Sequence, residues 1–217
     1  NERTGADGKT YAISFEMRLP SAWNGRFLYQ MNGGNDGAVV PAEGDMNTVG
    51  RASALARGFA VLSTDAGHNG NDSANANMGL AAGNLFGLDP QARADYGYAT
   101  TATMTPIAKT IIQRYYGADP AYSYMFGCSN GGRHGMVAAA RYAADYDGIL
   151  AGAPGFNLPK AAVQHAWDVQ SFQLADPDIR KAFSREDMQL VAANVLEKCD
   201  ALDGLQDGLV ADIRQCQ

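Results

Sequence analysis

The stretch "MFGCSNGGRHGM" (residues 125–136) decides how the chain is interpreted. An apolar run precedes it and an alanine-rich segment follows it, so we expect a strand, a sharp turn and a helix. Gly127, Ser129 and Gly131 form a G-x-S-x-G pattern, which is typical of a strained turn that exposes a serine hydroxyl. Its glycines are needed because the helix packs back against the strand. The pattern predicts Ser129 as a nucleophile, and an ordinary turn with a helix-capping serine is the alternative.

Two stretches could supply hydrogen bonds to an oxyanion. In the predicted turn, the backbone N–H of Asn130 would face the same point as the Ser129 hydroxyl, at the positive end of the helix. The stretch "MNGGNDG" (31–37) follows an earlier apolar run, and Gly33 and Gly34 there would let a backbone N–H approach a reacting carbonyl. Taken by itself, this second stretch fits a plain glycine turn equally well.

Strand-like and helix-like segments alternate through most of the chain, which favours an α/β fold with a largely parallel sheet. The expected strands lie in 11–20, 25–34, 58–67, 121–129 and 147–155, and the expected helices in 47–58, 99–117 and 130–146. Segments 35–46 and 67–97 are rich in glycine and asparagine and are expected to be long loops. After about residue 156 two helical patterns follow without a strand, and Ser184 with Asp187 predicts a capping box.

Of the three histidines, His68 and His134 are the candidates for a general base. His68 follows the predicted strand 58–67 and could line a pocket, although such a residue more often hydrogen-bonds a loop. His134 lies on the helix after the turn, where side chains point away from Ser129, so we expect a packing or surface residue. His165, in the later helical region, is expected to be structural. No acidic residue followed by a histidine comes after Ser129 in the order that an α/β-hydrolase needs.

The segment "CDALDGLQDGLVADIRQC" (199–216) places Asp200, Asp203 and Asp207 in a glycine-punctuated loop. Carboxylates this close repel one another unless a cation lies among them, and carboxylates interleaved with carbonyls suit Ca²⁺. The spacing differs from that of an EF-hand. A solvated acidic turn is the alternative interpretation.

Composition and charge exclude several kinds of partner. The 217 residues carry a net charge of −6, without a run of Lys or Arg, which disfavours nucleic acid and anionic membranes. No apolar run approaches the length of a membrane span. The chain begins at Asn1 without a signal segment and has an odd number of cysteines. We therefore expect a mature secreted or periplasmic protein, or a piece excised from one.

Together these stretches resemble the tannase and feruloyl esterase family of α/β-hydrolases. The resemblance is carried, in the family's order, by "GRFLYQMNGGNDG" (25–37), "GFAVLSTDAGH" (58–68), "FGCSNGGRHGM" (126–136), "YDGILAGAP" (146–154) and "CDALDGLQDG" (199–208). It implies part of an α/β-hydrolase core over residues 1–155, with a mostly parallel sheet flanked by helices. Residues 156–217 would begin a helical lid domain. The implied activity is hydrolysis of small aromatic esters, such as phenolic acid esters.

The resemblance also implies roles for single residues. Ser129 matches the nucleophile, and the backbone N–H of Asn130, with that of Gly33 or Gly34, matches the oxyanion hole. In the later part of the chain the family has a disulfide that braces a structural Ca²⁺ site. The disulfide corresponds to Cys199 and Cys216, and the calcium ligands to the carboxylates of Asp200, Asp203 and Asp207 and the carbonyls of Leu205 and Leu209.

One departure from the family limits these implications. The family bridges the cysteine of the turn, here Cys128, to a cysteine beside the catalytic histidine, and its catalytic Asp and His follow the lid. This chain stops at Gln217, so we expect the N-terminal part of an esterase, inactive alone, whose partner is the missing C-terminal part. The alternative is a non-catalytic, calcium-braced piece that binds a partner chain or a ligand without turnover.

Overall fold

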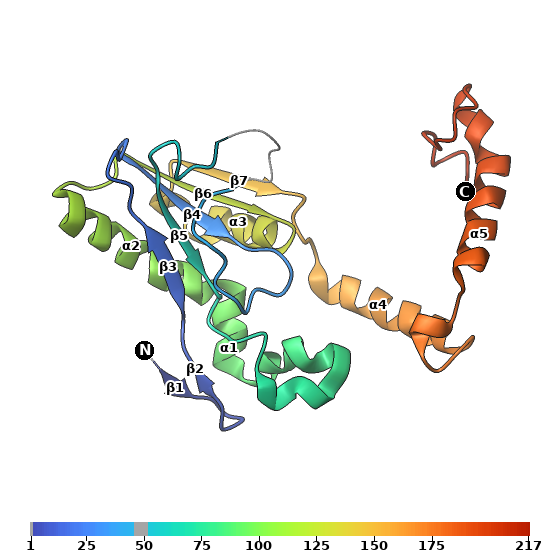
Figure 1. Cartoon of the computed structure of the whole chain (residues 1–217), viewed down its shortest axis with the longest axis horizontal. Coiled ribbons are helices and arrows are strands. Elements are labelled where there is room, and N and C mark those ends of the chain that lie inside the picture. Colours follow the sequence, from blue (N-terminus) through green and yellow to red (C-terminus); the bar gives the residue numbers. More distant parts are fainter. Residues whose placement is uncertain (1, 46–51) are drawn as a thin grey trace. The chain divides into compact units, whose positions relative to one another are not determined.

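The computed structural model describes residues 2–45 and 52–217. They form two compact units, one that ends at Phe156 and one that runs from Asn157 to Gln217 (Figure 1). The first unit contains a sheet with helices, and the second consists of helices and loops. Each unit is described by itself.

The first unit is built on a five-stranded sheet. Its strands are β3 (Phe15–Arg18), β4 (Arg26–Met31), β5 (Ala60–Thr64), β6 (Tyr122–Cys128) and β7 (Gly148–Gly152), and a separate hairpin pairs β1 (Arg3–Thr4) with β2 (Thr10–Tyr11). The order in the sheet is β3-β5-β4-β6-β7, with β3 antiparallel to β5 and every other pair parallel (Figure 1). The predicted, mostly parallel sheet is therefore confirmed. Met31 pairs with Gly127, so β4 and β6 end together at the carboxyl edge of the sheet.

Helices cover one face of this sheet. The α-helices of the unit are α1 (Pro90–Ala94), α2 (Thr100–Tyr116) and α3 (Asn130–Arg141), with 3₁₀ turns at Ser73–Leu88 and Ala143–Asp145 and a π turn at Asp95–Ala99. Gly117 caps the C-terminus of helix α2 in the left-handed conformation, with a φ of 75°. Strand alternation sends Phe27 and Tyr29 of β4 and Met125 of β6 into a core with α2 and α3. The opposite face carries Leu28 and a smaller cluster.

One local prediction was wrong, and another is tested only in part. Segment 67–97 is not one long loop but contains helical turns. One of them, α1, begins at Pro90 because the carboxylate of the preceding Asp89 caps it by accepting the N–H of Ala92. The predicted helix 47–58 lies in part outside the described residues. Its described end is only a turn, in which the Gly58 N–H donates to the Leu55 carbonyl.

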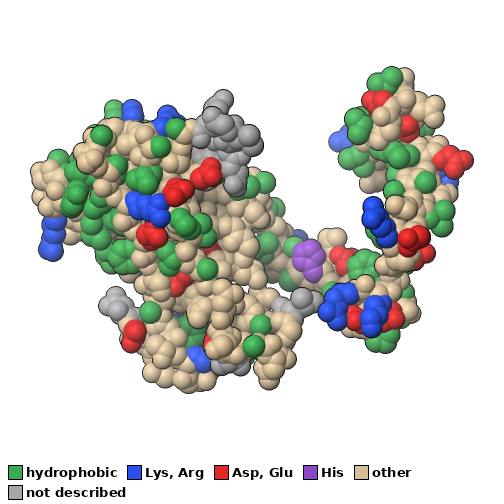
Figure 2. All heavy atoms as spheres, viewed as in Figure 1, with side chains coloured by type: hydrophobic (Ala, Val, Ile, Leu, Met, Phe, Trp, Pro, Cys, Tyr) green, Lys and Arg blue, Asp and Glu red, His purple; other side chains and the backbone are tan. Residues whose placement is uncertain are grey.

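The second unit carries α4 (Leu158–Gln173) and α5 (Arg185–Cys199), with 3₁₀ turns at Ile179–Lys181 and Asp200–Asp203. The predicted capping box is present: Ser184 accepts the Asp187 N–H, and the Asp187 carboxylate accepts the Ser184 N–H. Several apolar side chains of this unit are exposed (Figure 2). Val163 and Trp167 on α4 are among the exposed apolar residues. None of the described helices is long and apolar enough to span a membrane.

Candidate active site

Ser129 occupies the turn between β6 and α3, at the carboxyl edge of the sheet. Its φ of 59° and ψ of −119° form a backbone conformation that a non-glycine residue adopts only under constraint. Here the Ser129 N–H donates to Gly152, and its carbonyl accepts from Arg133 and Gly155, each at 3.0–3.1 Å. The side chain is exposed, and α3 starts at Asn130. The structure thus has the strand, strained turn and helix that the G-x-S-x-G pattern predicts, while the chemical role of Ser129 stays a prediction.

Glycines of the turn are required by close backbone packing. A Cβ on Gly127 would lie 2.4 Å from the carbonyl carbon of Gly131, and a Cβ on Gly131 would lie 2.5 Å from the carbonyl oxygen of Met31. Real Cβ atoms do not come this close to backbone atoms. The turn is therefore packed directly against the end of β4, and only glycine fits at positions 127 and 131.

Gly127→Ala is expected to lower the free energy of unfolding by about 3 kcal/mol, because the added methyl group must displace backbone rather than a flexible side chain. Gly97→Ala is the matched control, since no described atom lies within 4 Å of a Cβ there and its φ is not positive. Urea unfolding of both variants measures the difference. Equal midpoints for Gly127→Ala and the unchanged chain would contradict the packing argument.

The glycine loop 32–37 lies against the serine turn. The Asn32 side chain donates to Ser63 and to the carbonyl of Thr64, which anchors the start of the loop at the end of β5. A Cβ on Gly33 would lie 3.8 Å from the carbonyl oxygen of Cys128, so this exposed glycine is next to the turn. Gly34 is also exposed and has a positive φ of 62°. The structure thus brings both predicted oxyanion stretches to one place.

A cavity of about 520 Å³ opens beside Ser129. Its size suits a small organic ligand. The walls combine apolar and polar groups: Gln30, Met31, Asn32, Gly33, Val40, Pro41, Glu43, Asp45, Phe126, Cys128 and Ser129. Glu43 at its rim is paired with Arg18 at 2.9 Å. Cys128 is exposed and is a free thiol in this structure.

The side chain of Asn130 is held by a buried polar network. Its Oδ1 accepts the Tyr96 hydroxyl at 2.9 Å and the Arg133 Nε at 2.7 Å, and its Nδ2 donates to the Asp36 carboxylate at 2.6 Å. Asp36 lies in the glycine loop and also contacts His134 at 2.8 Å. The sequence pattern did not single out Asp36, and the only signal available was a charged residue between glycines. The network links the glycine loop directly to α3, the elbow helix, which follows the serine turn.

The histidines do not hydrogen-bond Ser129 in any contact that the structure describes. His134 is buried and belongs to the Asn130 network through its contact with Asp36. His68 is buried and stacked on Phe86 with ring centroids 3.6 Å apart, and it does not line the cavity beside Ser129. Burial lowers the pKa of both side chains below its ordinary value. His165 is exposed on α4, where Figure 2 shows a histidine at the surface.

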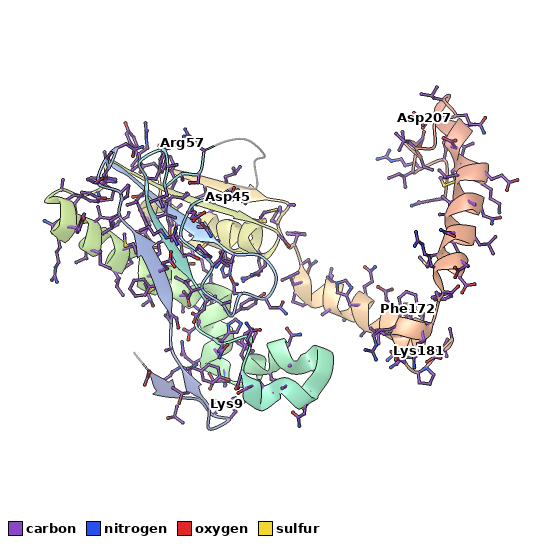
Figure 3. The ribbon with its side chains drawn as sticks, viewed as in Figure 1. Lys9, Asp45, Arg57, Phe172, Lys181 and Asp207 are labelled. Carbon is purple, nitrogen blue, oxygen red and sulfur yellow. A yellow bond between two sulfur atoms is a disulfide. The ribbon has the colours of Figure 1, made fainter. Side chains whose placement is uncertain are left out.

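The acidic loop of the second unit is stapled by the predicted disulfide. Cys199 and Cys216 are bonded, with their Cα atoms 5.2 Å apart, close to the loop that carries Asp207 (Figure 3). Asp200 accepts the N–H groups of Asp207 and Gly208 at 3.1 and 3.0 Å. The other two predicted carboxylate ligands also accept hydrogen bonds from loop amides: Asp203 from the N–H of Leu205, and Asp207 from the N–H of Leu209. Within the described part of the chain, no three His, Cys, Asp or Glu side chains are placed to share a metal ion.

A mixed sheet flanked by helices, with a serine at a strained strand-to-helix turn, defines an α/β-hydrolase type of fold. A family model described as tannase and feruloyl esterase matches residues 2–217. The chain belongs to the tannase and feruloyl esterase family.

Individual relatives agree with this assignment. Mono(2-hydroxyethyl) terephthalate hydrolase from Piscinibacter sakaiensis is 45% identical and is matched over 100% of this chain and 37% of its own length. A probable feruloyl esterase B-2 from Aspergillus flavus is 32% identical over 94% of this chain and 36% of its own length. Among solved structures, an esterase from Aspergillus oryzae is similar with a TM-score of 0.67 and 26% identity, over 100% of this chain and 39% of its own. The structure of tannin acyl hydrolase from Aspergillus niger is similar with a TM-score of 0.64 and 25% identity, over 98% of this chain and 36% of its own. The chain spans little more than a third of the length of these proteins.

Proposed function

We propose that this chain supplies the nucleophile and the oxyanion hole of a carboxylic ester hydrolase, with Ser129 forming an acyl-enzyme. The observation that carries the proposal is the strained turn at Ser129, which exposes this side chain to a cavity beside the glycine loop. Family membership supports the same activity. The test is hydrolysis of esters by the complete esterase polypeptide that contains this chain and by its Ser129→Ala variant.

In the proposed reaction, the Ser129 Oγ attacks the ester carbonyl carbon while a general base takes the hydroxyl proton. The tetrahedral oxyanion accepts hydrogen bonds from the backbone N–H of Asn130 and from that of Gly33 or Gly34. The intermediate then expels the alcohol, which receives the proton from the base. Water next attacks the acyl-enzyme by the same route and releases the acid.

The proposed substrates are esters of small aromatic acids. The names of the relatives, a terephthalate ester hydrolase and feruloyl esterases, support an aromatic acyl group. The cavity supports it as well, because Val40, Pro41 and Phe126 offer apolar walls beside Ser129. Comparing ethyl ferulate and methyl gallate with ethyl and methyl esters of short aliphatic acids would test this preference, and a short p-nitrophenyl ester would report general esterase activity. A faster reaction with aliphatic esters of equal leaving group would contradict it.

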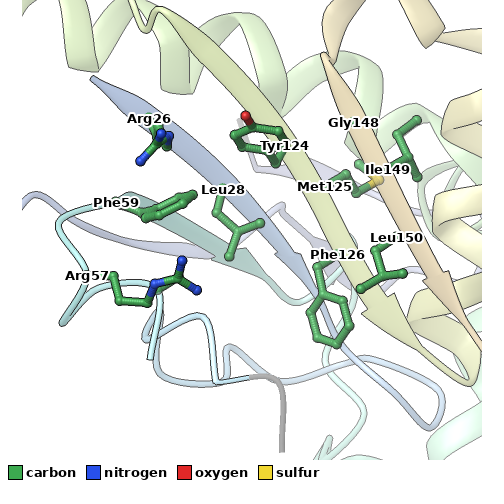
Figure 4. Close-up of a pocket in the computed structure, with 11 residues that line it drawn as sticks. Arg26, Leu28, Arg57, Phe59, Tyr124, Met125, Phe126, Gly148, Ile149 and Leu150 are labelled. Carbon is green, nitrogen blue, oxygen red and sulfur yellow. The ribbon is translucent and has the colours of Figure 1, made fainter. Parts of the chain in front are cut away.

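We also propose that the general base and its acidic partner come from polypeptide outside these 217 residues. Strand β7 is at the edge of the described sheet, and the face opposite the helices is hollowed into a groove of about 520 Å³ (Figure 4). Tyr124, Phe126 and Leu150 point their side chains into this groove (Figure 4). Such apolar surface favours association with further chain. The free thiol of Cys128 is the proposed attachment for a disulfide to that chain.

The second candidate function is binding without turnover. The observation that favours it is that the described hydrogen bonds connect no histidine to Ser129. Under this alternative, polypeptide added to the chain would bind but would restore no Ser129-dependent hydrolysis. The disulfide supports an oxidising, secreted or periplasmic location under either proposal.

A structural Ca²⁺ at the acidic loop is a further part of the proposal, because carboxylates interleaved with carbonyls suit this ion. Asp200, Asp203 and Asp207 accept loop amides here and would have to turn toward a shared ion to bind it. Chelation is expected to destabilise the second unit by about 2–3 kcal/mol when the ion was present at about 100 times its dissociation constant. Thermal melting with and without EDTA, disulfide intact, measures the effect. Asp203→Asn should abolish the response to chelator, and Asp212→Asn, a nearby control outside the proposed ligand set, should keep it. Equal melting temperatures with and without EDTA would contradict this part of the proposal.

A further inference from the structure

The glycine loop and the elbow helix are distant in sequence, and one buried carboxylate joins them. Asp36 and His134 are 98 residues apart, yet the Oδ2 of Asp36 lies 2.8 Å from the Nε2 of His134. The same oxygen accepts from the Nδ2 of Asn130 at 2.6 Å. The side chains of Asp36 and His134 are each only 1% exposed. A carboxylate this deeply buried needs such partners, because an unpaired one would be costly.

His134 lies between the Asp36 carboxylate and the Arg133 guanidinium. Its Nε2 is 2.8 Å from the Asp36 Oδ2 and 2.9 Å from a terminal nitrogen of Arg133. Burial lowers the pKa of His134 below its ordinary value. Two side chains of α3, His134 and Asn130, therefore hold the Asp36 carboxylate against this helix.

Asp36 also has a backbone conformation that serves the loop. Its φ is 55°, in the left-handed region that aspartate and asparagine tolerate better than most residues. The next residue, Gly37, donates its N–H to the carbonyl of Asp65 at 3.0 Å and accepts from Gly70 at 2.8 Å. The loop is thus held to the 65–70 segment by backbone hydrogen bonds and to the elbow helix by the Asp36 carboxylate.

The structure assigns Asp36 as a positioning residue: its carboxylate holds the glycine loop against Asn130, so that the N–H groups of both stretches converge on one oxyanion. This inference rests on the proposed ester hydrolysis. Asp36 does not line the cavity and does not touch the reacting atoms. Its contribution comes from preorganisation, because donors that are already aimed at the developing charge need no rearrangement during the reaction.

The kinetic test uses Asp36→Gly in the complete esterase polypeptide that contains this chain, assayed with a p-nitrophenyl ester. Glycine accepts the left-handed conformation without strain, so this variant removes the carboxylate alone. We expect kcat to fall about 10²-fold, the effect of misplacing a catalytic group by about 1 Å, with KM changed less than about threefold. Asp36→Asn keeps an acceptor oxygen and the backbone preference, and should remain within about tenfold of the unchanged enzyme.

Two controls separate positioning from folding. Asp89→Asn alters another buried carboxylate, which caps α1 and pairs with Arg3, and should lower stability without lowering kcat. Asn130→Ala breaks the same link from the helix side while keeping the backbone N–H. If Asp36 acts through Asn130, the double variant with Asp36→Gly loses less kcat than the product of the two single losses. Asn130→Ala therefore tests the link even where Asp36→Gly does not fold.

Hydrogen exchange in the 217-residue chain supplies a measurement that is independent of turnover. The amides of Gly37 and Gly70 hydrogen-bond the carbonyls of Asp65 and Gly37, and they should exchange faster in Asp36→Gly than in Asp36→Asn. An Asp36→Gly enzyme with kcat within about threefold of the unchanged one, while Ser129→Ala is inactive, would overturn the inference and leave the proposed function standing. Unreduced turnover in Ser129→Ala would instead overturn the proposed function.

Discussion

Ser129→Ala is expected to reduce ester hydrolysis by about 10⁴–10⁶-fold in the complete esterase polypeptide. The reason is chemical: alanine has no oxygen that can attack the carbonyl, so no acyl-enzyme forms and only the oxyanion hole remains. KM should change little, because the lost hydroxyl makes its bond in the transition state rather than in substrate binding. Steady-state hydrolysis of a p-nitrophenyl ester, together with mass spectrometry of the acyl-enzyme, measures both points.

The Ser129→Ala result is interpretable because the turn itself should survive. Ser129 is held by its backbone N–H and carbonyl, which donate to Gly152 and accept from Arg133 and Gly155, and alanine keeps all of these. Ser21→Ala is the matched control, at an exposed serine in a turn before β4. It should retain full activity. A Ser129→Ala enzyme that still forms an acyl-enzyme would show that another residue is the nucleophile.

The serine turn could be predicted from sequence because its constraints are local. Gly127 and Gly131 are required where two backbones meet, and an apolar strand and a helical segment lie on either side. The same holds for the capping box at Ser184, which depends on residues three positions apart. Patterns of this kind need no information about distant parts of the chain.

Asp36 could not be predicted in the same way, because its role depends on a residue 98 positions away. In the sequence it is one acidic residue in a glycine-rich stretch, and nothing local indicates that it is buried. The helical turns in 67–97 differ from Asp36 in this respect. Glycine and asparagine favour loops by composition, but the cap that Asp89 gives to α1, with Pro90 next to it, is a local signal in the sequence.

The 217-residue chain alone is expected to hydrolyse esters at least about 10³-fold more slowly than the complete polypeptide that contains it. A serine hydroxyl is a weak nucleophile until a base takes its proton. The described contacts connect none of the histidines to Ser129, and His68 and His134 are buried and do not line the cavity beside it. An oxyanion hole without a working base still accelerates the reaction about 10³–10⁴-fold over water, so a low residual rate should remain.

The decisive measurement is the turnover of the 217-residue chain after the rest of the esterase is added as a second polypeptide. The apolar groove on the open face of the sheet, lined by Tyr124, Phe126 and Leu150, should bind it, and turnover should rise only if Ser129 is intact. Leu150→Asp places a charge in that groove but not in the cavity beside Ser129, and it should weaken the restoration. Tyr115→Asp, at an exposed position on α2, is the control. Robust Ser129-dependent turnover by the 217 residues alone would show that the base is already present. His68→Ala would then identify it, because His68 is the histidine at the carboxyl end of β5, beside the glycine loop.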